Sequence, residues 1–287
     1  MTIKQLLRYV GSKTQLLESI TTQVAQIEHE KFEWIEPFCG SIVVPLHFIN
    51  DRRITHFHLN DINSNLIRFF RELQKIEHIE PIVEYMQGLI GHFEKDRSYY
   101  YTLRDDINHA EDMNSIEYLS TFLFINRTCF NGVSRYNSKG MYNVPVGKTN
   151  PKWVDVFGKL REVHEQLRYS FCPITFHNES YDSFVQKMTN RDIPRFIYCD
   201  PPYDDTFNMY NRILFVKDDQ TDLSNALQRQ SHPFLVHNTD TDKIRELYKQ
   251  CQLHSVSTRR CVSRNVETRG VTTELMITNF PLKELPS

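Results

Sequence analysis

The sequence predicts an α/β fold with a largely parallel sheet, interrupted by a mostly helical insert. Several short apolar runs are typical of buried strands, and amphipathic helical stretches follow several of these runs. This alternation favours right-handed crossovers between parallel strands, with helices on both faces of the sheet. Between about residues 66 and 159, helix-like segments dominate instead. We therefore expect residues 1–65 and 160–287 to form one domain, and residues 66–159 to form an inserted second domain.

The individual elements follow from apolar spacing and from turn residues. Buried strands are expected at residues 32–35, 56–59, 173–176, 195–199 and 234–237. Helices are expected at residues 63–75, 180–188, 221–229 and 241–250, and within the insert at 115–126. Residues 253–258 and 274–278 predict a closing hairpin around an arginine-rich loop. In the insert, Ser138-Lys139-Gly140 predicts the turn of a second β-hairpin between two extended arms.

Composition limits the classes of function. The chain has 287 residues, of which 40% are apolar and 12% aromatic, and this is enough for a substantial core. The formal net charge of -2 excludes a generic polycation, so a nucleic acid would have to bind local basic patches. One candidate is residues 127–148, which contain basic but no acidic side chains, although an ordinary solvated face explains them equally well. The apolar runs are too short for a membrane span, and we expect neither a membrane partner nor a signal peptide.

Six cysteines are scattered without a Cys-x-x-Cys pair. This spacing argues against a zinc site and a disulfide framework, and favours reduced thiols in a cytoplasm. His56 and His58 alternate along an expected strand and have the spacing of metal ligands. No third ligand lies near them in the sequence, so we expect no metal.

Asp200-Pro201-Pro202-Tyr203 directly follows the expected strand at 195–199. Ligands of open α/β sheets bind outside the carboxyl ends of strands, which is where this tetrapeptide falls. The two prolines stiffen the chain and lack amide hydrogens, so the corner presents one carboxylate, backbone carbonyls and one aromatic ring. The alternative is a rigid turn with a surface tyrosine.

Such a corner suits chemistry at an aromatic amine. The lone pair of adenine N6 is delocalised into the ring, and two hydrogen-bond acceptors on its N–H groups favour a pyramidal, nucleophilic nitrogen. The Asp200 carboxylate and the Pro201 carbonyl are candidates for those acceptors, and Tyr203 for stacking on the base. A base in a duplex must leave the stack to reach such a corner.

Two further segments have the character of a cofactor site. Glu36-Pro37-Phe38-Cys39-Gly40 follows the first expected strand, and Asn60-Asp61 ends the second. Gly40 lets the chain approach a ligand, and an acid at the position of Asp61 can hold ribose hydroxyls. Asp61 serves equally well as the cap of the following helix. Lys13, at an expected helix start, opposes the helix dipole, which is consistent with a carboxylate partner from a ligand or another motif. An ordinary surface lysine explains this segment equally well.

Taken together, these segments resemble the Dam-like DNA N6-adenine methyltransferase family (D12 class). The order is that of the family: Tyr9-x-Gly11-x-Lys13, Glu36-Pro37-Phe38-x-Gly40, Asn60-Asp61-Ile62-Asn63, an insert, and then Asp200-Pro201-Pro202-Tyr203. Within the insert, residues 126–137 and 140–147 resemble the DNA-reading segment of the family. The resemblance spans nearly the whole chain. It implies a Rossmann-like S-adenosylmethionine-dependent methyltransferase fold with a helical DNA-recognition domain, acting on double-stranded DNA.

The resemblance also implies a set of site residues. The catalytic corner would be Asp200, Pro201, Pro202 and Tyr203. S-adenosylmethionine would contact Tyr9, Lys13, Phe38, Gly40, Asp61, Tyr181 and Asp200. DNA would contact Arg8, Phe130, Asn131, Arg135 and Asn137, with Phe130 as a wedge beside the extruded adenine and Arg135 on a guanine edge. The target would be GATC or a site that contains GAT.

This sequence departs from the family at one position, where Ile42 replaces the second glycine of Glu-Pro-Phe-x-Gly-x-Gly. That replacement bears on affinity for the methyl donor. We expect a monomer, and the sequence leaves open a cognate restriction endonuclease as partner. The rival functions are an N4-cytosine, RNA or protein methyltransferase and a DNA-binding protein with a vestigial catalytic half. A dehydrogenase is disfavoured because no Gly-x-Gly-x-x-Gly follows a strand.

Overall fold

The computed structural model describes residues 5–133, 135–137, 139–189, 193–203, 215, 217–259 and 271–283. These residues fall into two compact units. The first, called here the helical unit, comprises residues 5–12 and 63–170. The second, called the sheet unit, comprises residues 13–62 and the described residues from 171 onward.

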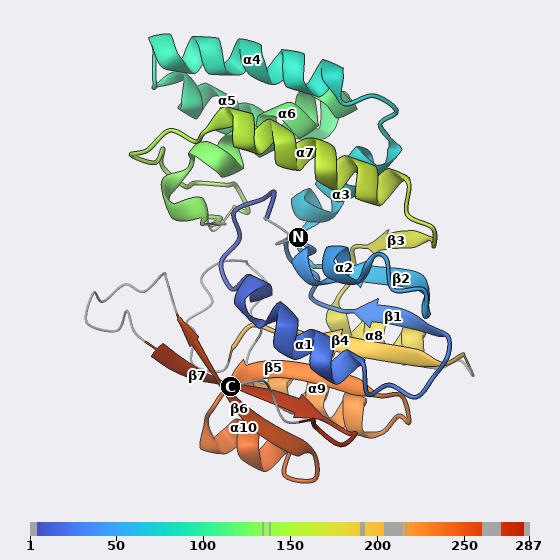
Figure 1. Cartoon of the computed structure of the whole chain (residues 1–287). Coiled ribbons are helices and arrows are strands. Elements are labelled where there is room, and N and C mark those ends of the chain that lie inside the picture. The colour runs from blue at the N-terminus through green and yellow to red at the C-terminus, as the bar shows by residue number, and fades with distance from the viewer. Residues whose placement is uncertain are drawn as a thin grey trace. The chain divides into compact units, whose positions relative to one another are not determined.

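The sheet unit is built on one sheet with the strand order β3-β2-β1-β4-β5-β7-β6 (Figure 1). Strands β1 to β5 pair with one another in parallel. Strand β7 lies between β5 and β6 and is antiparallel to both. The bounds are β1 Phe32–Glu36, β2 Ile54–Asn60, β3 Ile174–His177, β4 Arg195–Cys199, β5 Phe234–Thr239, β6 Gln252–Arg259 and β7 Val271–Thr278. The predicted α/β class, its parallel strands and its closing hairpin are therefore confirmed. The arginine-rich loop that was predicted between the last two strands lies at 260–270, outside the described residues.

The strand order reverses direction between β1 and β4, which pair through Glu33↔Arg195 and Ile35↔Ile197. From β1 the chain proceeds to β2 and β3 on one side, whereas β4 and β5 lie on the other. In open α/β sheets, ligands bind at such a point, in the crevice outside the carboxyl ends of the strands. The segments that follow Glu36 and Cys199 leave their strands at this point.

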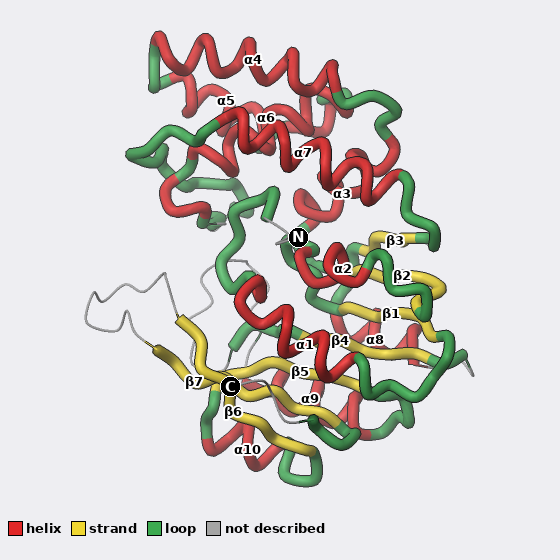
Figure 2. Tube along the Cα trace, in the orientation of Figure 1, coloured by secondary structure: helices red, strands yellow, loops and turns green. Residues whose placement is uncertain are grey.

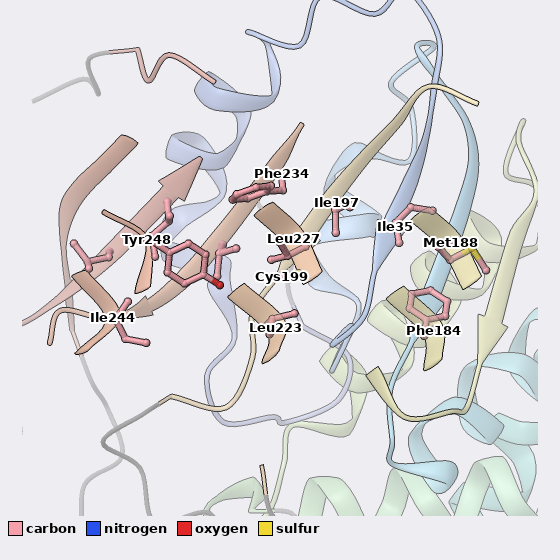
Figure 3. Close-up of a cluster of buried hydrophobic side chains, with 13 residues drawn as sticks. Ile35, Phe184, Met188, Ile197, Cys199, Leu223, Leu227, Phe234, Ile244 and Tyr248 are labelled. Atoms are coloured by element: carbon pink, nitrogen blue, oxygen red, sulfur yellow. The ribbon is translucent and has the colours of Figure 1, made fainter. Parts of the chain in front are cut away.

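Helices cover both faces of this sheet (Figure 2). They are η1 Lys13–Leu16, α1 Leu17–Val24, α2 Val43–Phe48, α8 Tyr181–Thr189, α9 Lys217–Gln228 and α10 Asp242–Leu247. On one face, Ile197 and Cys199 of β4 pack with Leu223 and Leu227 of α9 in a buried cluster (Figure 3). On the other, the Trp34 ring lies 5.0 Å from that of Phe48 in α2. All five residues of β4 are buried, because its side chains alternate between two faces that are both covered.

The helical unit consists of α3 Ser64–Lys75, α4 Glu80–Lys95, α5 Tyr99–Ile107, α6 Ser115–Thr128 and α7 Trp153–Arg168, with short turns η2 Ala110–Asp112 and η3 Phe130–Gly132. The predicted helix at 115–126 is confirmed as α6. Asn114 and Glu117 form a capping box at its start. The Phe124 ring of α6 stacks on Trp153 of α7 at 5.4 Å and meets Phe93 of α4 edge-on, so α6 is the centre of this bundle.

The predicted hairpin of the insert exists as two arms without regular strands. An isolated antiparallel bridge joins Tyr136 to Tyr142, and the amide of Asn137 donates to the carbonyl of Met141 at 2.9 Å. Ser138, in the predicted turn, lies outside the described residues.

In the described part of the chain, no helix has the length and apolar character needed to cross a membrane.

Candidate active site

The tetrapeptide 200–203 leaves the carboxyl end of β4, and an ion pair holds its first residue. The Lys13 ammonium donates to Asp200 Oδ2 at 2.7 Å, with side-chain exposures of 6% and 20%. The expectation that Lys13 meets a carboxylate is confirmed, and an ordinary surface position is excluded. Burial raises the pKa of Asp200, while Lys13 acts in the opposite direction and Glu274 reinforces the rise. The ion pair therefore offsets part of the cost of burying this carboxylate.

Tyr203, at the other end of the corner, is held from two sides. Its hydroxyl donates to Glu274 Oε2 at 2.7 Å, and Lys13 Nζ lies 5.0 Å from the centre of its ring. Burial, together with the neighbouring carboxylates, raises the pKa of Tyr203 well above its ordinary value, so the hydroxyl stays a neutral donor. Tyr203 is therefore half-buried and held at its hydroxyl, unlike the surface tyrosine of the alternative.

A buried amide relay holds the backbone of the corner. Gln220 Nε2 in α9 donates to the Pro202 carbonyl at 2.8 Å, and Asn238 Nδ2 in β5 donates to Gln220 Oε1 at 2.9 Å. Among the described residues, no such bond reaches the carbonyl of Pro201. Thus Gln220 fixes the backbone of the corner at Pro202. Sequence analysis missed Gln220, Asn238 and Glu274, although an acid within the apolar run of β7 is a signal that could have drawn attention to Glu274.

On the β1 side of the crevice, Gly40 and Asp61 are joined directly. The Gly40 amide donates to Asp61 Oδ2 at 3.0 Å, and Gly40 has a positive φ of 48°. The helix that follows β2 is capped by Asn63, whose side chain accepts from the Leu66 amide. The alternative role of Asp61 as a helix cap is therefore wrong, and its buried carboxylate serves the glycine loop instead.

Asn60, also missed by sequence analysis, ties together the loops after β1 and β3. Its Nδ2 donates to the carbonyls of Pro37 and Glu179, each at 3.1 Å, and its Oδ1 accepts from the Glu179 amide at 3.0 Å. The two bonds with Glu179 position the start of α8, and with it Tyr181. The Tyr181 ring lies 5.5 Å from that of Phe38, and Phe215 completes an aromatic trio at 5.8 and 5.4 Å.

Ile42 occupies the position where the family has a glycine, and its backbone is left-handed with φ 54° and ψ 21°. A β-branched residue in this conformation is strained, by about 1–3 kcal/mol. The side chain is completely buried, and burial of an isoleucine stabilises by a comparable amount, about 1.5–3 kcal/mol. The loop thus keeps the backbone shape that glycine allows, and packing offsets the strain.

Glu36, at the end of β1, is a buried acid that accepts from Trp34 Nε1 at 2.8 Å. Burial raises its pKa well above the ordinary value, the Trp34 hydrogen bond opposes this, and Asp200 and Asp61 add to it. Burial thus favours the neutral form of Glu36, which carries no negative charge beside those two carboxylates.

In the helical unit, the predicted DNA-contacting residue Arg8 is fixed by its backbone. The Arg8 amide donates to Asn126 Oδ1 at 2.7 Å, and Asn126 Nδ2 donates to the Arg8 carbonyl at 2.9 Å. Gly132 has a positive φ of 65°, and a Cβ at that position would collide with Cβ of Arg8. Arg8 therefore lies against position 132 so closely that a side chain larger than that of glycine would force it to shift.

The remaining predicted DNA contacts lie around the two arms of the insert. Phe130 is 44% exposed, and Asn131 beside it is exposed with a positive φ of 54°. The exposed Arg135 side chain donates to Oδ1 and the carbonyl of Asn143 at 2.8 and 3.0 Å. Asn137 differs, because its Oδ1 accepts from the amides of residues 139 and 141 and so shapes the turn.

The predicted donor-contacting residue Tyr9 also lies in the helical unit, where it lines a small cavity with Asn63, Asn126 and Tyr136. The sheet unit brings together the rest of the predicted catalytic and donor set: Lys13, Phe38, Gly40, Asp61, Tyr181, Asp200, Pro201, Pro202 and Tyr203. The predicted site residues are thus divided between the two units.

Glu33 is a third potential metal ligand beside His56 and His58 in the structure. The expectation that these two histidines have no third ligand near them was therefore wrong. Strand pairing places Glu33 opposite His56, and the ligand atoms of the three residues lie within 4.8 Å of one another. Sequence spacing does not reveal a neighbour across strands. Arg195 donates to Glu33 Oε2 at 2.7 and 2.9 Å, and its positive charge makes the trio less suited to a cation than its residue types indicate.

Comparison with known proteins agrees with the order of the motifs. The profile of the D12 class N6 adenine-specific DNA methyltransferases matches residues 9–262. The type II methyltransferase M.MjaIII of Methanocaldococcus jannaschii is 28% identical over 98% of this chain and 100% of its own length. The DNA adenine methylase of Escherichia coli K12 is 30% identical over 94% of this chain and 93% of its own. The Escherichia coli retron Ec67 DNA adenine methylase is 26% identical over 94% and 90%. With its motifs in the family order on a seven-stranded α/β sheet, the chain belongs to the D12 class of S-adenosylmethionine-dependent, N6 adenine-specific DNA methyltransferases.

Proposed function

We propose that this enzyme methylates an adenine extruded from duplex DNA, within GATC or a site that contains GAT. The observation that carries the proposal is the corner at 200–203, where Lys13, Gln220 and Glu274 fix three successive parts of the motif. A corner fixed at three points can hold the amino group of a base in one orientation, and alignment supplies much of the rate in such transfers.

The residues around the crevice fit S-adenosylmethionine, which when bound supplies a methyl group made electrophilic by the sulfonium. Asp61 offers a buried carboxylate for ribose hydroxyls, and Gly40 lets the loop approach closely. Phe38 and Tyr181 offer aromatic faces for the adenine of the donor. Lys13 offers a positive charge, and Asp200 a negative charge. We also assign Tyr9 to this donor set.

The corner itself would prepare the nucleophile. Asp200 and the Pro201 carbonyl accept hydrogen bonds from the amino group, and Tyr203 stacks on the base, a contact worth about 1–3 kcal/mol. Two acceptors on one nitrogen favour a pyramidal geometry, in which the lone pair is less delocalised into the ring. Asp200 and Pro201 would thus hold the amino group with its lone pair available to the electrophilic methyl group that the donor supplies. A base inside the duplex cannot reach these groups, and so extrusion is required.

We assign sequence reading to the helical unit and methyl transfer to the sheet unit. Arg8, Asn131 and Arg135 would contact DNA, with Arg135 on a guanine edge and Phe130 in the space that the adenine leaves. Asn137 would support this surface through the turn that it shapes. One chain carries both parts, so we expect it to act as a monomer, which light scattering of the complex with DNA would test.

Tritium transfer from labelled S-adenosylmethionine to duplexes with GATC, GATATC or a scrambled site, followed by nucleoside analysis, tests the proposal. N6-methyladenine confined to one of the two GAT-containing duplexes is the expected result. Label on cytosine, or label spread equally over all three duplexes, would contradict it. Asp200→Ala should abolish transfer and leave DNA binding intact, whereas a wild-type chain that takes up no donor would be a vestigial enzyme.

A further inference from the structure

We propose that Glu274 is a positioning residue for methyl transfer, because it fixes the orientation of the Tyr203 ring. The inference rests on the proposed stacking of Tyr203 on the target base. A tyrosine that serves as a stacking surface works only if its ring plane is held, since rotation about the bonds of the side chain would tilt the surface away. The hydroxyl is the part of the side chain farthest from the backbone, so a bond there fixes where the ring lies. Because the phenolic O–H prefers the plane of the ring and a hydrogen bond is directional, the same bond also restrains rotation of that plane.

Glu274 is well placed to supply that bond. It lies within β7, where its backbone pairs with Thr239 of β5 on one side and Val256 of β6 on the other. A strand held by ladders on both sides is among the most rigid supports in a fold. The residue is 7% exposed, and its Oε2 accepts from the Tyr203 hydroxyl at 2.7 Å. Glu274, on a strand that is paired on both sides, thus holds the hydroxyl end of the Tyr203 side chain.

A carboxylate is a suitable acceptor for this bond. A carboxylate accepts only, so the single donor of the phenol is committed to it, and bonds to charged groups are stronger than bonds between neutral ones. Lys13 Nζ lies 5.0 Å from the ring centre and 2.7 Å from Asp200, so its positive charge lies close to both the ring and the catalytic carboxylate. Glu274 is therefore one end of a connected row that runs through Tyr203 and Lys13 to Asp200.

The test compares Glu274→Ala, Glu274→Gln, Tyr203→Phe and the double variant Glu274→Gln/Tyr203→Phe in the full-length enzyme. Glu246→Gln is the matched control, because Glu246 has a 71% exposed side chain in a surface ion pair with Lys249. We expect Glu274→Ala and Tyr203→Phe each to lower kcat by about tenfold, with KM for the donor little changed. Glutamine keeps an acceptor, so Glu274→Gln should recover part of the loss, and the control should match wild type.

The double variant separates positioning from general stability. If Glu274 acts through the Tyr203 hydroxyl, adding Glu274→Gln to Tyr203→Phe should lower kcat no further. Two losses that multiply, or a Glu274→Gln enzyme with wild-type kcat, would overturn the inference. Should Glu274→Ala fail to fold, Glu274→Gln still decides.

A crystal structure of Glu274→Gln provides a readout that does not depend on turnover. The Tyr203 ring should move or occupy more than one position, and a single unchanged ring would count against the inference. Methyl transfer by the wild-type enzyme tests the proposed function separately. If the proposed function is wrong, the wild-type enzyme will show it. If the role of Glu274 is wrong, only the comparison of variants will show it.

Discussion

The Lys13 ammonium lies 2.7 Å from the Asp200 carboxylate, and the two residues come from positions 187 apart in the chain. Burial raises the pKa of Asp200, and Lys13 opposes that rise, so without Lys13 the pKa would be higher. The lysine therefore helps to keep the carboxylate ionised, which is the form that accepts hydrogen bonds from an amine.

This relationship predicts a pH dependence. Burial raises the pKa of Asp200 above its ordinary value of 3.8, so kcat should fall as the pH is lowered through that raised pKa. Lys13→Met removes the group that lowers the pKa, and the acid limb of the profile should therefore move to higher pH. The profiles are to be measured with saturating donor, because Lys13 also belongs to the proposed donor site. A limb that stays in place or moves to lower pH in Lys13→Met would exclude this role.

Asp61→Asn should weaken binding of the donor. Asparagine can still accept from the Gly40 amide, but it loses the negative charge proposed to hold ribose hydroxyls. We expect the donor KM to rise about tenfold, equivalent to about 1.4 kcal/mol, with kcat little changed. Titration calorimetry with S-adenosylhomocysteine measures the same loss directly. Asp242→Asn, in the first turn of α10, is the control, and equal affinities for the two variants would refute the role.

Gly132→Ala should impair DNA binding. The added methyl collides with Arg8 Cβ, and the positive φ of 65° disfavours alanine, so the segment around Arg8 must shift. We expect the Kd for a cognate duplex to rise by about tenfold or more, as measured by fluorescence anisotropy.

Gly158→Ala in α7 is the matched control, because its methyl meets no atom within 4 Å. This change should instead stabilise the helix by about 0.5–1 kcal/mol in denaturant unfolding. Equal DNA binding by the two alanine variants would show that the space beside Arg8 does not matter for the complex.

Arg135→Ala should relax discrimination at one base pair. A bidentate arginine on guanine contributes about 1–3 kcal/mol, so the preference for GATC over singly substituted sites should fall by roughly 5–150-fold at that position. The bonds from Asn143 orient the guanidinium beforehand, and Asn143→Ala should produce a smaller loss of the same kind. Competition assays with single-substitution duplexes give the comparison, and unchanged selectivity in Arg135→Ala would reject this contact.

The strands could be predicted because each is a short apolar run with a polar residue or turn at its end. Asp200 and Asp61 could be assigned to strand ends for the same reason. Their supporting residues could not be predicted, since Glu274, Gln220 and Asn238 reach the corner only through strand pairing and helix packing. The proximity of Glu33 to His56 could not be predicted for a similar reason. It depends on the register between two strands, and that register has no local signature in the sequence.

The left-handed backbone at Ile42 has a consequence for how relatives of this enzyme are detected. What the cofactor loop requires is a pair of dihedral angles, and the identity of the residue is secondary once enough packing surrounds it. Searches that insist on glycine at both loop positions would discard sequences whose interior compensates in this manner. A criterion written in terms of chain geometry would retain them.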